Sequence, residues 1–124
     1  MKTNADIKNA EQQEAAPKPK KRFYCPVEAT LSQIGGKYKA IILYHLLEDK
    51  VLRFHELQEY MPNATAKMLT QQLRELEADG LIHREVYPVV PPKTEYSLTE
   101  RGKTLKGVIY PICQWGREHM AGTF

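Results

Sequence analysis

One segment, NATAKMLTQQLRELEADGLI at residues 63–82, constrains the fold most strongly, because the hydrophobic period changes at its end. Leu69, Leu73 and Leu76 recur at helical spacing, and Gly80 follows as a helix stop. From Leu81 onward, in LIHREVY, apolar and polar residues alternate as they do in a half-exposed strand. The segment therefore predicts a helix that leads directly into a β-strand.

The rest of the chain predicts further helices before this segment and one after it. Apolar spacing and stop signals place helices at residues 26–34, 37–49, 53–61, 65–79 and 100–120. The returning strand is TEYSL, and PVVPPK forms a six-residue loop between the two strands. Pro111 lies inside the last helix and is expected to kink it or to loosen the preceding turn. This order of elements predicts a fold class that is mainly α with a small β-hairpin wing (α+β), a winged helix-turn-helix.

Charge divides the 124 residues into two parts. Residues 1–22 hold six Lys or Arg and three acidic residues, whereas residues 23–124 hold twelve of each, so the net charge of +3 belongs to the first part. We expect residues 1–22 to be a flexible basic tail, either a solubilising arm or an arm that seeks phosphates. No apolar run is long enough for a membrane span or a signal peptide, which predicts a cytoplasmic protein.

The outer face of the 65–79 helix carries the chemistry that nucleic acid requires. Opposite the leucines lie Lys67, Gln71 and Arg74, flanked by Thr70, and the acidic residues lie toward the C-terminal half. Thr65 can cap the helix and leave its N-terminus free to meet a phosphate. Glutamine suits the edge of adenine, and arginine suits guanine or phosphate. In the wing, Arg84 and Lys93 are candidates for backbone contacts, so the expected partner is double-stranded DNA.

Two other classes of function compete with DNA binding. A winged-helix module that binds protein would show aromatic or large apolar anchors on this face, and the sequence places none there. For an enzyme, the sequence offers neither an acid pair nor a nucleophile with its base, and no catalytic residue, cofactor or metal site is predicted. IGGKY lacks the spacing of a phosphate-binding loop, and the helix beginning at His55-Glu56 has Glu59 where a zinc site needs histidine.

The chain resembles the HxlR-type regulators, winged helix-turn-helix proteins related to the MarR group. The matching pieces are CPVEATLSQIGGKYKAIIL, the long stretch from RFHELQEY to SLTERG, and WG at 115–116, which together span roughly residues 24–118. The family often has proline where this chain has Ala66 and tryptophan where it has Tyr38. The resemblance implies a bacterial DNA-binding regulator, expected to be a repressor, with its recognition helix at 65–79 and its wing at 83–96. It also implies a homodimer, formed through the first and last helices, on a pseudo-palindromic operator.

The two cysteines suggest different roles. Cys25 precedes a helix and lies near Lys21 and Arg22, an environment that favours a thiolate. It is either an inert, partly packed cysteine or a sensor of oxidants or electrophiles, and the resemblance supports the sensor because some relatives use the matching cysteine. The sequence is therefore compatible with regulation by a small-molecule or oxidant effector. Cys113, in the apolar stripe of the last helix, is expected to be a core or interface residue.

Overall fold

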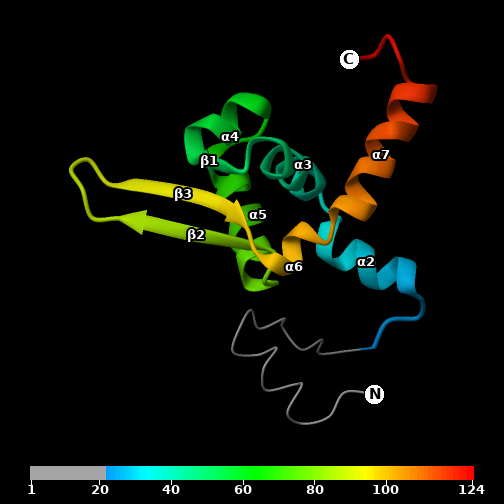
Figure 1. Ribbon diagram of the computed structural model, residues 1–124, viewed down its shortest axis with the longest axis horizontal. Helices are drawn as coiled ribbons and strands as arrows, with labels where there is room; N and C mark the ends of the chain where they lie inside the picture. Colours follow the sequence, from blue (N-terminus) through cyan, green and yellow to red (C-terminus); the bar gives the residue numbers. More distant parts are fainter. Residues whose placement is uncertain (1–21) are drawn as a thin grey trace.

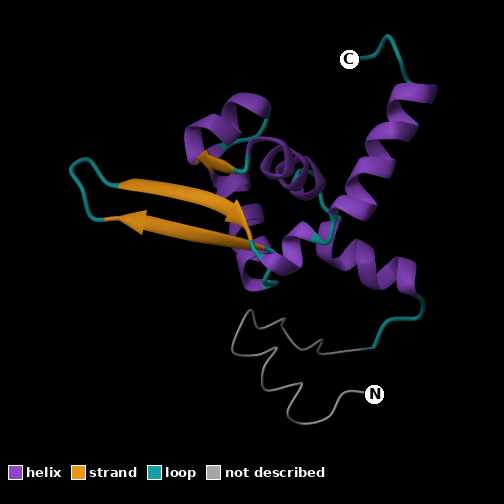
Figure 2. Cartoon of the chain, in the orientation of Figure 1, coloured by secondary structure: helices purple, strands orange, loops and turns teal. Residues whose placement is uncertain are grey.

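The computed structural model describes residues 22–124, and the predicted tail, residues 1–22, lies almost entirely outside this range. Helices and the strands of a three-stranded antiparallel sheet follow one another along the chain, and the hairpin of residues 82–98 projects from the helical body as an arm (Figures 1 and 2). The elements are α2 (Pro26–Ile34), α3 (Lys39–Asp49), β1 (Val51–Arg53), α4 (Phe54–Tyr60), α5 (Ala66–Ala78), β2 (Ile82–Tyr87), β3 (Lys93–Leu98), α6 (Glu100–Lys103) and α7 (Lys106–His119). The predicted fold class, winged helix-turn-helix, is confirmed.

The core lies where α3, α4 and α5 meet one face of the sheet. Its fully buried side chains are mainly leucine and isoleucine: Ile42, Leu43, Leu46, Leu57, Leu69, Leu73, Leu76 and Ile109. The apolar residues of α3 and α5 recur at helical spacing, so each helix presents one continuous stripe to the others. Of the helices formed by residues 22–124, none has the length and apolar character that crossing a membrane requires.

The sheet contains a strand that the sequence analysis missed. Strand order is β1-β3-β2, with Leu52 of β1 opposite Tyr96 of β3, and Arg84 of β2 also opposite Tyr96. The hairpin itself was predicted, although its loop is one residue shorter than expected, because Lys93 already pairs with Tyr87. β1 pairs with the edge of β3 that β2 leaves free. The wing is therefore anchored to the helical body through β3, the central strand of the sheet.

The C-terminal segment differs from the single kinked helix that was predicted. Thr99 caps α6, its Oγ1 accepting the Gly102 N–H at 2.9 Å, but the helix stops after one turn and α7 begins at Lys106. The interruption lies at Thr104 and Leu105, upstream of Pro111, which α7 contains. The prediction of one continuous helix over residues 100–120 is therefore wrong. α6 packs closely against the preceding chain at Gly102, where an added Cβ would meet the Leu81 carbonyl oxygen.

Candidate nucleic-acid interface

α5 presents the predicted polar face to solvent. Thr65 is its N-cap, and its Oγ1 accepts the Met68 N–H at 3.0 Å. The three leucines at the predicted spacing are buried, which turns Lys67, Gln71 and Arg74 outward, and Thr70 lies half-buried at the edge of this face. α4, the turn at residues 61–65 and α5 together form the predicted helix-turn-helix. We call the surface made by Lys67, Gln71 and Arg74 the α5 face.

A buried lysine on α3 supports the α5 face by pairing with Glu75, which in turn contacts Gln71. The sequence analysis did not identify this lysine. Lys39, the first residue of α3, is only 7% exposed, and its Nζ donates to Glu75 Oε1 at 2.7 Å. The other carboxylate oxygen, Oε2, accepts from Gln71 Nε2 at 2.8 Å. The hydrogen bond from Lys39, followed by that from Gln71, lowers the pKa of Glu75, so the carboxylate stays charged.

This network fixes the orientation of Gln71. One amide hydrogen is already donated to Glu75, which leaves Oε1 and the second N–H available to a partner. The charge of Glu75, which would repel phosphate, is compensated by Lys39. The only signal in the sequence was a lysine at the start of an otherwise apolar helix, a position that the helix dipole disfavours unless an anion lies nearby.

A shallow cavity of about 190 Å³ separates α5 from the hairpin. Its lining includes Thr70 and Arg74 from α5, and Arg84 and Tyr96 from the strands. Arg84 Nε donates to Glu77 Oε1 at 3.2 Å, so this arginine faces the helix. Two predicted site residues, Arg74 and Arg84, are thus brought to the same cavity.

Lys93, in contrast, lies on the opposite face of the hairpin. It is the first residue of β3, and its Nζ lies 3.8 Å from Glu95 Oε2 and 4.5 Å from the centre of the Tyr87 ring. Glu85 stands directly opposite Glu95 on the same face. Glu95 also raises the pKa of the Tyr87 hydroxyl, so Tyr87 stays neutral. The loop that precedes Lys93, residues 88–92, forms the tip of the wing and contains only proline and valine. Lys93 is therefore the cation nearest that tip.

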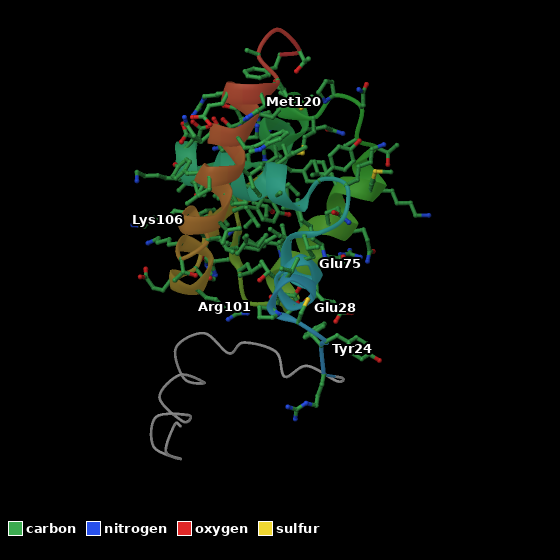
Figure 3. The ribbon with its side chains drawn as sticks, turned by 90° about the vertical axis from the view of Figure 1, so that its right-hand side faces the viewer. Tyr24, Glu28, Glu75, Arg101, Lys106 and Met120 are labelled. Atoms are coloured by element: carbon green, nitrogen blue, oxygen red, sulfur yellow. The ribbon has the colours of Figure 1, made fainter. Side chains whose placement is uncertain are left out.

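Cys25 lies outside this interface, at the N-terminus of α2. It is exposed, it is the N-cap residue, and its Sγ accepts the Glu28 N–H at 3.5 Å. Figure 3 shows Tyr24 and Glu28 close together at the start of α2, where the Tyr24 N–H donates to Glu28 Oε1 at 2.6 Å. Arg22 is exposed, and Lys21 lies outside the described residues. Cys113 is half-buried and packs against the core, as expected for a structural cysteine.

A helix-turn-helix followed by a hairpin that lies beside its second helix defines the class: this is a winged helix-turn-helix protein. Within residues 22–124, no three His, Cys, Asp or Glu side chains are grouped so that they could hold a metal ion. The structure places three candidate functional features on this fold: the α5 face, the Arg74–Arg84 cavity and the cysteine at α2.

Comparison with known proteins agrees with this class. The model of the HxlR-like helix-turn-helix family matches residues 33–123. YdeP of Bacillus subtilis (strain 168), an uncharacterized HTH-type transcriptional regulator, is 59% identical over 95 residues, covering 77% of this chain and 73% of YdeP. The solved structure of the redox regulator HypR in its oxidized form is 55% identical, with a TM-score of 0.73, and covers 77% of this chain and 97% of HypR. Its reduced form gives 52% identity, a TM-score of 0.75, and coverage of 78% and 95%. The chain belongs to the HxlR-like helix-turn-helix family of transcriptional regulators.

Proposed function

We propose that this protein regulates transcription by binding a pseudo-palindromic operator in double-stranded DNA as a homodimer. The observation that carries the proposal is the α5 face, where two cations and an oriented amide project from a capped helix that follows a helix-turn-helix bend. A helix of this kind fits the major groove, with its first turns closest to the bases. Family membership supports the same role. Its location would be the cytoplasm, and repression is the expected mode.

The side chains divide into base contacts and phosphate contacts. Gln71, with Oε1 free, and Arg74 are proposed to contact base edges, since both can form paired hydrogen bonds there. Thr65, Lys67 and Thr70 would contact phosphates at the helix N-terminus. Arg84 and Lys93 would reach the backbone on either side of the wing, each while keeping a carboxylate neighbour.

The test is selection of bound fragments from randomised DNA, followed by titration of the selected operator. Arg74→Ala should weaken operator binding by about 1–3 kcal/mol and relax the base preference. Lys93→Ala should weaken all sequences alike and reduce the salt slope by about one. Lys106→Gln, at an exposed lysine on α7, removes the same charge and should change neither. If no sequence were enriched, the protein-binding alternative would replace this proposal.

Cys25 is proposed as an oxidant-responsive residue of the regulator. The support is its exposure at the start of α2 and the similarity of the chain to a redox regulator known in oxidized and reduced forms. With diamide as oxidant, two thiols would join in a disulfide, and their two protons and two electrons would reduce diamide to the hydrazine. An intersubunit bond between two Cys25 residues would fix the angle of α2 and thereby the spacing of the two α5 helices.

This role is tested by adding diamide to wild type, Cys25→Ser and Cys113→Ser, and measuring operator affinity. Wild type and Cys113→Ser should both respond, because Cys113 packs against the core and reacts more slowly. Cys25→Ser should not respond. An identical response from wild type and Cys25→Ser would exclude Cys25 as the sensor.

A further inference from the structure

A second cavity, of about 460 Å³, has no proposed DNA contact among its lining residues. It is bounded by the end of α3, by β1 and β3, and by the α6–α7 segment. Its floor is apolar, formed by Leu46, Leu47, Val51 and Leu98. Three lysines stand around it: Lys50, Lys103 and Lys106. We call it the lysine cavity, and its volume lies in the range of small-molecule sites.

The charges around the lysine cavity are unbalanced. None of its lining residues is acidic. Two nearby carboxylates are already engaged, since Glu100 accepts from Lys103 Nζ at 2.9 Å and Glu48 accepts from the Tyr110 hydroxyl at 2.7 Å. Among residues 22–124, Lys50 and Lys106 have no ion-pair partner. Two ammonium groups are therefore available to an anion beside an apolar floor.

Both of these lysines occupy positions that local stability disfavours. Lys50 has φ of 71° and ψ of −52°, a conformation that glycine adopts far more readily than any residue with a side chain. Lys106 is the first residue of α7, where the helix dipole opposes a cation; Figure 3 shows it at the surface. The dipole of α3 does favour a cation near Lys50, but any position in the last turn of α3 would provide that without positive φ. Non-glycine residues held in such a conformation cluster at functional sites.

We propose that the lysine cavity binds a small phosphate monoester that carries an apolar group. A phosphate monoester has a charge of about −1.5 to −2 at neutral pH, which two free ammonium groups match. The apolar part would cover the floor, and Lys50 and Lys106 would hold the phosphate. The Tyr110 hydroxyl donates its hydrogen bond to Glu48, so Tyr110 offers its ring to the ligand. Binding does not depend on the proposed function, and only a resulting change in DNA affinity would rest on it.

The experiment titrates phenyl phosphate into the full chain by calorimetry, with backbone amide shifts recorded by NMR. Inorganic phosphate tests the head group alone, and benzyl alcohol tests the apolar part alone. Phenyl phosphate should bind at least about tenfold more tightly than either. The largest amide shifts should fall on Val51, Ser97, Leu98 and Tyr110.

The variants separate this cavity from the DNA surface. Lys50→Gly combined with Lys106→Gln should weaken phenyl phosphate binding by at least about tenfold. Lys50→Gly should leave the fold intact, because glycine suits the backbone there. The matched control, Lys67→Gln combined with Arg74→Gln, removes the same number of charges from the α5 face and should leave the affinity unchanged. The proposal is overturned by the absence of binding at about 1 mM, by equal affinity for inorganic phosphate, or by loss of binding in the α5-face control alone.

Discussion

At the scale of single residues, the most informative side chain is the buried Lys39. A cation removed from water is stable only when an anion accompanies it, and Glu75 provides that anion at 2.7 Å. Glu75 also accepts a hydrogen bond from the amide of Gln71, so one carboxylate connects the buried Lys39 to the exposed Gln71 on α5. Stability and the geometry of the proposed base contact are therefore linked at this pair.

Glu75→Gln should lower the free energy of unfolding by about 1–2 kcal/mol, because it leaves the Lys39 ammonium buried without its counter-ion. This estimate is below that for a fully buried pair, since the Glu75 side chain is 40% exposed and water screens it. Lys39→Met, which removes the buried charge itself, should lower the free energy of unfolding by less than Glu75→Gln does. Urea denaturation of the two variants tests the order, and the reverse order would show that the lysine stem, rather than its charge, is needed.

His45 should make stability depend on pH. Its ring stacks on Tyr60 at 3.7 Å, joining α3 to α4, and burial lowers its pKa below 6.5, partly opposed by Asp49 and Glu48. Because the unfolded chain binds the proton more readily, the stabilisation is fully present above about pH 6.5 and is lost as the pH falls toward the lower folded value.

Urea midpoints measured at about pH 7.5 and about pH 5.5 should differ more for wild type than for His45→Gln, which cannot titrate. Because carboxylates also begin to titrate toward the lower pH, the comparison with this variant isolates the histidine. Equal differences in the two proteins would mean that His45 does not contribute.

At the scale of elements, the sequence predicted the helix-turn-helix and the hairpin because their signals are local. Periodic leucines, the cap at Thr65 and the stop near Gly80 all act within a few residues. β1 has only three residues, too few for a period, and it forms because the edge of β3 is free and Leu52 can be buried there. The α6–α7 break was also missed, because the apolar spacing continues through it and the close approach of Gly102 to Leu81 is a tertiary contact.

The candidate site likewise has features that local sequence signals predict and features that depend on tertiary packing. The outward direction of Lys67, Gln71 and Arg74 was predictable from one helix. The Lys39–Glu75 and Arg84–Glu77 pairs depend on how α3 and the hairpin pack against α5, which no local pattern records. The same holds for Lys93, whose position on the face opposite Arg84 follows from strand register.

Two glycines provide a matched test of the element packing. A Cβ at Gly102 would collide with the backbone carbonyl oxygen of Leu81, whereas a Cβ at Gly107, in the first turn of α7, would meet nothing within 4 Å. Gly102→Ala should therefore destabilise the fold by about 2–3 kcal/mol through overpacking. Gly107→Ala should stabilise it by up to about 1 kcal/mol, the gain in helix propensity. Thermal unfolding of both proteins tests this, and a neutral Gly102→Ala would mean that α6 can move away from Leu81 at little cost.

At the scale of the whole molecule, α2 and α7 expose more apolar surface than an isolated domain should. The exposed fractions are 97% for Tyr24, 65% for Val27 and 55% for Leu31 near and on α2, and 52% for Ile112 and 57% for Trp115 on α7. Figure 3 shows both helices on the side of the molecule that faces the viewer. Clustered apolar residues of this kind mark interfaces, which supports dimerisation through the first and last helices.

Trp115→Glu should convert a dimer into a monomer, because a buried, unpaired carboxylate opposes association. Light scattering at micromolar concentration measures the change in mass, and Val90→Glu is the matched control, since Val90 is 98% exposed at the wing tip. The monomer should also lose operator affinity by far more than tenfold, because a dimer contacts two half-sites spaced about 34 Å apart and one α5 contacts only half of them. A wild-type monomer would contradict the proposed homodimer, and a Trp115→Glu dimer with full operator affinity would place the interface elsewhere. Either result would also remove the route by which oxidation at Cys25 could change the spacing of the two α5 helices.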